Sequence, residues 1–307
     1  MLNRESFIGV LFALFAAIGF SAKAILIKLA YLEHVDAITL LALRMVFSIP
    51  FFIVVAVWVN SRDHHPLKRQ DWIAVVVLGL LGYYLSSFLD FLGLLYITAG
   101  LERLILFLYP TMTVILSAFI YKRPIGRKVI MAMALSYVGI VLVFFHDVGM
   151  SQANADLNQS DVLLGAGLVF ASALSYSSYL VGAGHAIGRM GATRFTAYAS
   201  IVACVASLLQ FFATHTLASL NLTLRVYELS FAMAIFSTVL PVFLLSYAIR
   251  RIGSASSSMI GSIGPVVTIG LAYVFLNEAL SVLQIAGTVL VMSGVLMISL
   301  NSKKVPI

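Results

Sequence analysis

Charge is the property that this chain has least of. Asp, Glu, Lys and Arg make up only 10% of its 307 residues, while 62% are hydrophobic. A soluble domain carries about 25% charged residues, so the shortage excludes an ordinary soluble protein. The alternation of polar and apolar residues that marks outer-membrane strands is also missing. We therefore expect an all-α membrane protein.

The apolar residues are gathered in ten stretches, and a helix of roughly 20 such residues is long enough to cross a bilayer. The connections between the stretches are too short to hold a soluble catalytic domain. The sequence therefore predicts ten transmembrane helices in one integral membrane unit. The stretches cover residues 6–30, 37–59, 72–96, 100–121, 127–146, 161–184, 193–214, 226–249, 254–276 and 279–300.

Motifs for ATP hydrolysis, metal binding and ester or peptide hydrolysis are missing. The chain contains no G-x-x-x-x-G-K-[ST] of a P-loop and no H-E-x-x-H or G-x-S-x-G. Its six histidines lack the spacing of a metal site, and the single Cys204 excludes an internal disulfide. We expect no metal, no cofactor and no enzyme activity. An intramembrane enzyme with Asp90 and Glu102 as acid and base is the alternative from another class.

The net charge of +7 follows the membrane topology rather than a nucleic-acid partner. With a cytoplasmic N-terminus, 14 of the 19 Lys and Arg residues fall on the cytoplasmic side, which is the positive-inside pattern. The connecting loop at 147–160 is acidic and falls outside. The pattern predicts that both termini are cytoplasmic. The 14 residues are Arg4, Arg62, Lys68, Arg69, Lys122, Arg123, Arg127, Lys128, Arg189, Arg194, Arg250, Arg251, Lys303 and Lys304.

The two halves of the chain resemble each other. A shift of 155 residues lays segment 98–144 on 253–299 and aligns Pro110 with Pro265 and Gly139 with Gly294. We expect one five-helix repeat at 6–146 and a second at 161–300. Five is an odd number, so the second repeat would enter the membrane from the opposite side. Inverted repeats of this kind are a recurring design of transporters.

Two sets of residues have a distinctive spacing, one in each half of the chain. The first half contains Asp90, Tyr96, Gly100, Leu101, Glu102, Arg103, Tyr109, Pro110 and Thr111, and the second contains Pro265, Glu278, Gln284, Gly287 and Gly294. In these residues the chain resembles the EamA-type transporters of the drug/metabolite transporter superfamily, and the resemblance covers nearly its whole length. It departs from them at Arg123, where many members carry an acid, and at Ile18-Gly19, where an aromatic-Gly pair is common. The resemblance implies ten helices in two inverted five-helix repeats, a bacterial inner membrane, and export of small metabolites, amino acids or drugs.

Four charged residues lie inside the early stretches: Lys23, Arg44, Asp90 and Glu102. Charged side chains within a membrane are costly, and they usually pair, face a watery cavity and carry function. At ~1.5 Å of rise per residue, Lys23, Arg44 and Asp90 lie about 7, 6 and 9 Å from mid-span, all in the external half. Their common level predicts a shared cavity.

Helical phase extends this candidate site. Tyr83 and Ser87 are expected on the face of Asp90, and Tyr109 is expected on a polar stripe with Glu102. The second half offers neutral partners in Tyr176, Tyr179 and Ser257. At positions related to the four charges it has Tyr179, Ser200, Leu245 and Ser257, without any charge. A charge set required by the fold alone is expected in both halves, so the asymmetry favours function.

The sequence thus predicts a secondary-active transporter that exports a small polar or amphipathic metabolite by alternating access, driven by protons or by exchange. Asp90 would take up a proton or bind a cationic group, and Arg44 and Lys23 would bind a carboxylate. A structural alternative stays open: Asp90 neutralises Lys23 or Arg44, and Glu102 pairs with Arg103 near the external surface. Uptake by the same fold and a lipid-handling channel are further alternatives.

Overall fold

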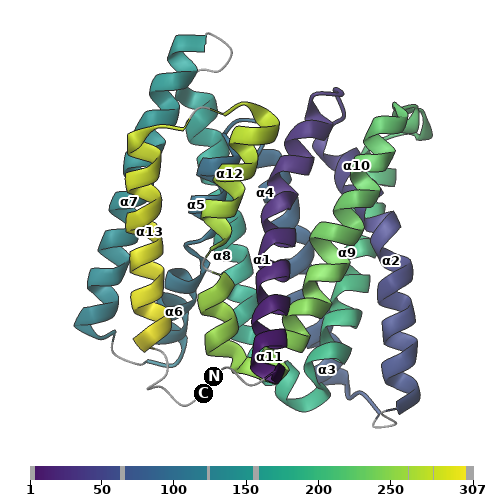
Figure 1. The fold of residues 1–307 in the computed structure, drawn as a ribbon. Helices are drawn as coiled ribbons and strands as arrows, with labels where there is room; N and C mark the ends of the chain where they lie inside the picture. The colour runs from purple at the N-terminus through teal and green to yellow at the C-terminus, as the bar shows by residue number, and fades with distance from the viewer. Residues whose placement is uncertain are drawn as a thin grey trace.

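The protein forms one helical bundle, as the computed structural model shows for residues 4–62, 66–122, 125–154, 159–261, 263–278 and 280–301 (Figure 1). Within these ranges the chain contains no β-strand, and the predicted all-α class is confirmed. Arg123, Lys303 and Lys304 lie outside the described residues. The elements are α1 (Arg4–Tyr31), α2 (Ala37–Arg62), α3 (Arg69–Gly79), η1 (Leu80–Leu85), α4 (Ser86–Gly93), α5 (Ala99–Leu106), α6 (Tyr109–Ile120), α7 (Arg127–Asn154), α8 (Gln159–Met190), α9 (Ala192–Thr214), η2 (Leu217–Leu220), α10 (Leu224–Ala234), η3 (Ile235–Val239), α11 (Leu240–Gly261), α12 (Gly264–Leu276) and α13 (Val282–Asn301).

Seven helical stretches are long and apolar enough to cross a membrane, and three shorter apolar helices accompany them. The shorter ones, Ile130–Phe145, Gly264–Leu276 and Val282–Met297, coincide with the fifth, ninth and tenth predicted stretches. Large apolar side chains such as Val54 and Phe119 are exposed on the outside of the bundle, as a lipid-facing surface requires. The total of ten crossings stays a prediction.

Elements of the second half begin 155 residues after their counterparts in the first. This spacing separates α1 from α8, α2 from α9, α3 from α10, η1 from η3, α6 from α12, and α7 from α13. It equals the shift that aligns the two halves of the sequence. The spacing therefore supports the predicted division into two five-helix repeats.

Helices are interrupted at related places in both halves. The π-helical segments η1 and η3 form wider helical turns at one pair of related positions. A second pair of interruptions precedes α6 and α12, where Pro110 and Pro265 occupy the first turn. Proline is accepted there because the first N–H groups of a helix have no partner within it. The breaks place backbone irregularities inside the bundle, where side chains from other helices surround them.

Two predicted connections are helical instead. Helix α7 continues to Asn154, past the expected end at 146, and α8 already begins at Gln159, so most of the expected 147–160 loop is helix. Helix α11 carries helical backbone through residues 250–253, where the connection between the eighth and ninth stretches was expected. Neither segment contains a proline, which would have stopped the helix.

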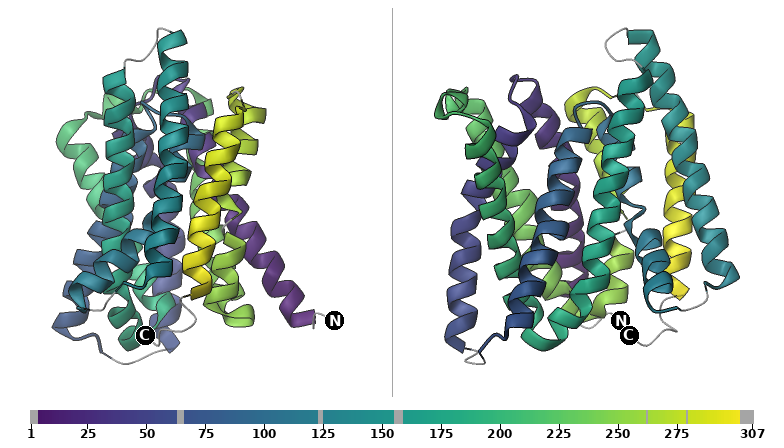
Figure 2. Two further views of the ribbon diagram at one scale, coloured as in Figure 1. Left: turned by 90° about the vertical axis from the view of Figure 1, so that its left-hand side faces the viewer. Right: turned by 180° about the vertical axis from the view of Figure 1, so that it is seen from behind.

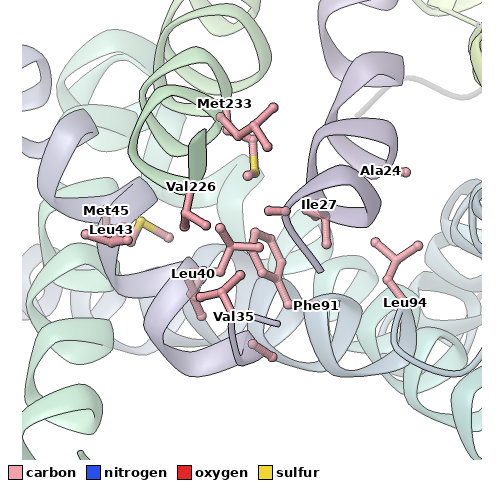
Figure 3. Close-up of a cluster of buried hydrophobic side chains, with 14 of the residues drawn as sticks. Ala24, Ile27, Val35, Leu40, Leu43, Met45, Phe91, Leu94, Val226 and Met233 are labelled. Carbon is pink, nitrogen blue, oxygen red and sulfur yellow. The ribbon is translucent and has the colours of Figure 1, made fainter. Parts of the chain in front are cut away.

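The two halves share one hydrophobic core. Leu40 and Phe91 from the first half pack with Val226 and Met233 from the second, and all four are fully buried (Figure 3). Helices α7 and α13 lie side by side (Figure 2) and touch through glycines. A Cβ on Gly287 would lie 2.5 Å from the carbonyl oxygen of Gly139, so only small residues permit this approach.

Candidate functional site

Lys23 and Asp90 form an ion pair inside the bundle. Lys23 on α1 donates a hydrogen bond from Nζ to Oδ2 of Asp90 on α4, at 2.6 Å. The side chain of Asp90 is 1% exposed and that of Lys23 is 18% exposed. The predicted meeting of these two residues is therefore present, and Lys23 rather than Arg44 is the direct partner of Asp90.

Glu102 joins the same pair from α5. Its Oε1 lies 3.8 Å from Nζ of Lys23, and its side chain is fully buried. The expected pair with Arg103 near the external surface is wrong, because the start of α5 is covered rather than exposed. The carboxylate of Glu278, in the turn between α12 and α13, accepts hydrogen bonds from the N–H groups of Ala99 at 3.0 Å and Gly100 at 3.4 Å.

Arg44 lies beside the pair without binding to it. Its guanidinium stacks on the ring of Phe91, with Cζ 4.8 Å from the ring centroid, and the residue is only 5% exposed. Among the described residues it forms no ion pair, and its Nε has no hydrogen-bond partner. Burial of an unmatched cation is costly. Lys23, Arg44, Asp90 and Glu102 are named the charged cluster below.

The tyrosines of the candidate site form a separate group. The hydroxyls of Tyr83 and Tyr179 share a hydrogen bond of 3.0 Å. The ring centroids of Tyr109 and Tyr176 are 5.3 Å apart, and those of Tyr176 and Tyr179 are 5.5 Å apart. These four residues are named the tyrosine group. They come from η1, α6 and α8, so both halves of the chain contribute.

Irregular helices change two of the expected faces, those of Tyr83 and Tyr109. Tyr83 lies within π-helical η1, which changes the phase of the residues before Asp90. Tyr83 therefore binds Tyr179, whereas Asp90 binds Lys23. The stripe from Glu102 to Tyr109 is also broken, because α5 ends at Leu106 and α6 begins anew at Tyr109.

Two further predicted residues are on helices α4 and α11. Ser87 is half-buried on α4, and Ser257 is buried on α11. Within the described ranges, no three His, Cys, Asp or Glu side chains converge in a way that could hold a metal ion. The site is therefore described by the charged cluster and the tyrosine group.

Sequence reasoning missed several residues that support the site. Tyr31 donates a hydrogen bond to the carbonyl of Phe91 at 2.6 Å and so fixes the backbone next to Asp90. Ser172 on α8 donates to the carbonyl of Ser86 at 2.6 Å. The role of Glu278 at the start of α5 was also missed, because the contact joins residues 179 positions apart. Local patterns carry no signal for such contacts.

The comparisons with known proteins agree with this architecture. The model of the EamA-like transporter family matches residues 7–145 and 163–300. The uncharacterized transporter YcbK of Bacillus subtilis (strain 168) is 29% identical over 289 residues, which cover 92% of this chain and 90% of that protein. The uncharacterized transporter YyaM of the same organism is 25% identical, with coverage of 74% and 73%.

A solved crystal structure shares the fold over nearly the whole chain. It superposes with a TM-score of 0.64 at 17% sequence identity and covers 96% of this chain and 98% of its own. At this identity the likeness concerns the fold alone. The family match covers both halves of the chain and the apolar helices that the structure shows. This protein therefore belongs to the EamA-like transporter family and is a multi-pass membrane protein.

Proposed function

We propose that this protein is a secondary-active transporter that exports a small polar or amphipathic metabolite, with an amino-acid-like zwitterion as the best match. The observation that carries the proposal is the charged cluster, which four separate helices bring together inside the bundle. Charged residues within membrane helices mark the paths of substrates and ions. Buried charge of both signs suits a substrate that carries both signs.

The substrate's two charged groups would bind at different places. Arg44 has a buried guanidinium without a carboxylate partner among the described residues, so it would bind the substrate carboxylate. A guanidinium binds a carboxylate through two parallel hydrogen bonds. The ammonium group would replace Lys23 at Asp90, because Lys23 is the only partly exposed member of that ion pair.

Alternating access is supported by the repeat. Figure 1 shows that α1 rises through the bundle whereas its counterpart α8 descends. This direction is what two inverted five-helix repeats require, and both repeats contain the interrupted helices that transporters use at their substrate sites. The two halves would rock around the charged cluster.

Polar contacts join the halves at both ends of the bundle. At one end, Glu278 binds the start of α5. At the other end, Nε of Arg189 on α8 donates to Oδ1 of Asp71 on α3 at 2.7 Å. Access from one side at a time requires that one contact opens while the other stays closed. We propose these two contacts as the outer and inner closures.

The proposed location is the bacterial cytoplasmic membrane, with both termini in the cytoplasm. The start of α1 and the end of α13 lie at the same end of the bundle (Figure 1). Arg69 and Arg127 begin α3 and α7, and Arg189 lies in the last turn of α8, all at that end. Excess Lys and Arg favours the cytoplasmic side.

The proposal is tested by flux of radiolabelled amino acids and small metabolites in proteoliposomes, with and without a pH gradient. Wild type is expected to move at least one zwitterion with saturation, and Asp90→Asn is expected to lose this flux. Glu228→Gln is the matched control, because it removes one carboxylate that is exposed and far along the chain from the cluster. Saturable flux that is equal in wild type and in Asp90→Asn would contradict the role of the cluster.

A further inference from the structure

Asp90 and Glu102 together bring four carboxylate oxygens to the single ammonium group of Lys23. Oδ2 of Asp90 has Lys23 at 2.6 Å, but Oδ1 of Asp90 and both oxygens of Glu102 are buried without a hydrogen-bond donor among the described residues. The nearest cation to Glu102 is again Lys23, at 3.8 Å. An unmatched buried carboxylate carries a large desolvation cost.

A single proton would give two of these carboxylate oxygens a hydrogen bond. The carboxyl groups of Glu102 and Asp90 face the same ammonium group of Lys23, at 3.8 and 2.6 Å, which brings them close enough to each other that one could donate a hydrogen bond to the other. Two carboxylates cannot form such a bond, because each then only accepts; a protonated carboxyl group donates. A proton on Glu102 lets it donate to Oδ1 of Asp90, while Oδ2 keeps Lys23. Two of the three orphan oxygens are then satisfied, and the three side chains together are neutral.

The proton belongs on Glu102 rather than on Asp90. Asp90 is within direct ion-pair distance of Lys23, whereas Glu102 is more than 1 Å farther from the same ammonium. The negative charge is more stable on the carboxyl group with the shorter contact to a cation. The alternative, a protonated Asp90 beside Lys23, would leave ionised Glu102 with the weaker contact.

The other charged groups around Glu102 do not change the preference for a proton on Glu102 rather than on Asp90. Arg103 on the same helix and Glu278 at the start of that helix have opposite charges. Arg44 on α2 stacks on Phe91. Among the described residues, the remaining helices packed against α5 contribute apolar or neutral side chains. Val143, Val169 and Val291 come from α7, α8 and α13, and Ile269 of α12 and Gln284 of α13 face Gly100.

We propose that Glu102 is the residue that binds and releases the coupling proton, and that the Asp90–Lys23 pair positions it. The inference rests on the proposed function and reassigns the proton from Asp90 to Glu102. When Glu102 loses its proton, the cluster gains one negative charge and the hydrogen bond to Asp90 is lost. Lys23 is the partly exposed residue of the Asp90–Lys23 pair, and it is then attracted by two carboxylates instead of one. A cationic group of the substrate therefore meets a site with one more negative charge.

Infrared spectroscopy tests the proton directly, without transport. Purified protein made with ¹³C-carboxyl-labelled glutamate should shift a protonated-carboxyl band that label on aspartate leaves in place, and Glu102→Gln should remove that band. Glu278→Gln is the matched control and should keep it, because this carboxylate accepts two backbone N–H bonds. A band that shifts with the aspartate label, or that survives in Glu102→Gln, would overturn the proposal.

Flux supplies the second readout. Glu102→Gln keeps a neutral side chain that donates to Asp90, so it should fold and exchange substrate, but its flux should be the same with and without a pH gradient. Wild type should be several-fold faster with the gradient. If Glu102→Gln responds to the gradient like wild type, Glu102 is not the proton site. If wild type moves no substrate, the proposed function fails while the infrared result still decides on Glu102.

Discussion

Most helices of one half of this protein have a counterpart in the other, but the chemistry at the centres of the two halves differs. With the constant spacing of 155 residues, Asp90 corresponds to Leu245 and Glu102 to Ser257. The same spacing relates Lys23 to Ser178 and Arg44 to Ala199, so the counterparts expected from the sequence, Tyr179 and Ser200, were one residue too far along the chain. Ser178 only donates to the carbonyl of Leu174 in its own helix, at 2.9 Å. The second half thus builds corresponding helices without the charges, except that the single helix α11 stands where the first half has α4 and α5. Most of the helical architecture therefore does not require the charges.

Asp90→Leu places the second half's residue in the first half and should have the largest effect. Lys23 would lose its contact at 2.6 Å and keep only Glu102 at 3.8 Å. Removing one partner of a buried ion pair costs about 3–5 kcal/mol. We expect a loss near the lower value, because Glu102 can ionise and replace Asp90 in part.

Thermal unfolding in detergent measures this loss, and Leu245→Ala in the second half is the matched comparison. Leu245 is half-buried and has no charge to leave unpaired. Its Tm should fall less than that of Asp90→Leu. Equal Tm values for the two variants would show that the ion pair adds nothing to the stability of the first half.

Arg44→Lys should have the next largest effect, on substrate affinity. Arg44 corresponds to Ala199, so the second half offers no equivalent cation. Lysine keeps the charge but loses the two parallel hydrogen bonds to a carboxylate. A hydrogen bond to a charged group contributes about 1.5–3 kcal/mol, which corresponds to roughly a 10- to 100-fold higher KM.

The effect of Arg44→Lys on substrate affinity is compared with the effect of a changed substrate, in which an amide replaces the carboxylate. Wild type should lose as much affinity for the amide as Arg44→Lys loses for the parent substrate. The combination should add little further loss, because both changes remove the same bond. Additive losses would place the carboxylate elsewhere.

Glu278→Gln should have a smaller effect, on the Tm. Glu278 belongs to the second half and binds helix α5 of the first half. The carboxylate lies at the positive end of α5 and binds the N–H groups of Ala99 and Gly100. A negative charge at a helix start contributes about 0.3–1 kcal/mol and is weakened by salt. We expect a lower Tm at low salt and a smaller difference at high salt. A Tm that is independent of salt would assign the effect to packing.

Tyr83→Phe should have the smallest effect. It removes the hydrogen bond of 3.0 Å to Tyr179 but keeps both rings in place. A neutral hydrogen bond contributes about 0.5–1.5 kcal/mol. Tyr84→Phe, on the neighbouring residue, is the control and should leave the Tm unchanged. If Tyr83→Phe also slows flux several-fold, the tyrosine group belongs to the substrate path.

The contact between Lys23 and Asp90 was predictable because it depends on depth in the membrane, which the π-helical segment before Asp90 changes much less than it changes the helical phase. Depth follows from rise per residue, and rise is nearly constant along a helix. The repeat was predictable for a similar reason, since helix starts follow the apolar periodicity of each half. The shift of 155 residues found in the sequence therefore appears again in the helix boundaries.

The predictions that failed depended on irregular backbone and on contacts between residues distant in sequence. The π-helical segment before Asp90 separates Tyr83 from the face that an α-helix would give it. The hydrogen bonds between Glu278 and the start of α5 join residues almost 180 positions apart (179 for Ala99), which no local pattern reveals. The prediction of a loop at 147–160 failed because this segment contains no proline, which would have stopped helix α7 earlier.

The most direct test of the central claim uses the double variant Lys23→Ser with Asp90→Leu, which gives the first half the residues of the second. Saturable substrate flux in proteoliposomes is measured together with Tm. If the charged cluster serves transport, the double variant should regain most of the stability that Asp90→Leu loses and still show no flux above empty vesicles. Flux equal to that of wild type would contradict the account, because the cluster would then be dispensable for transport.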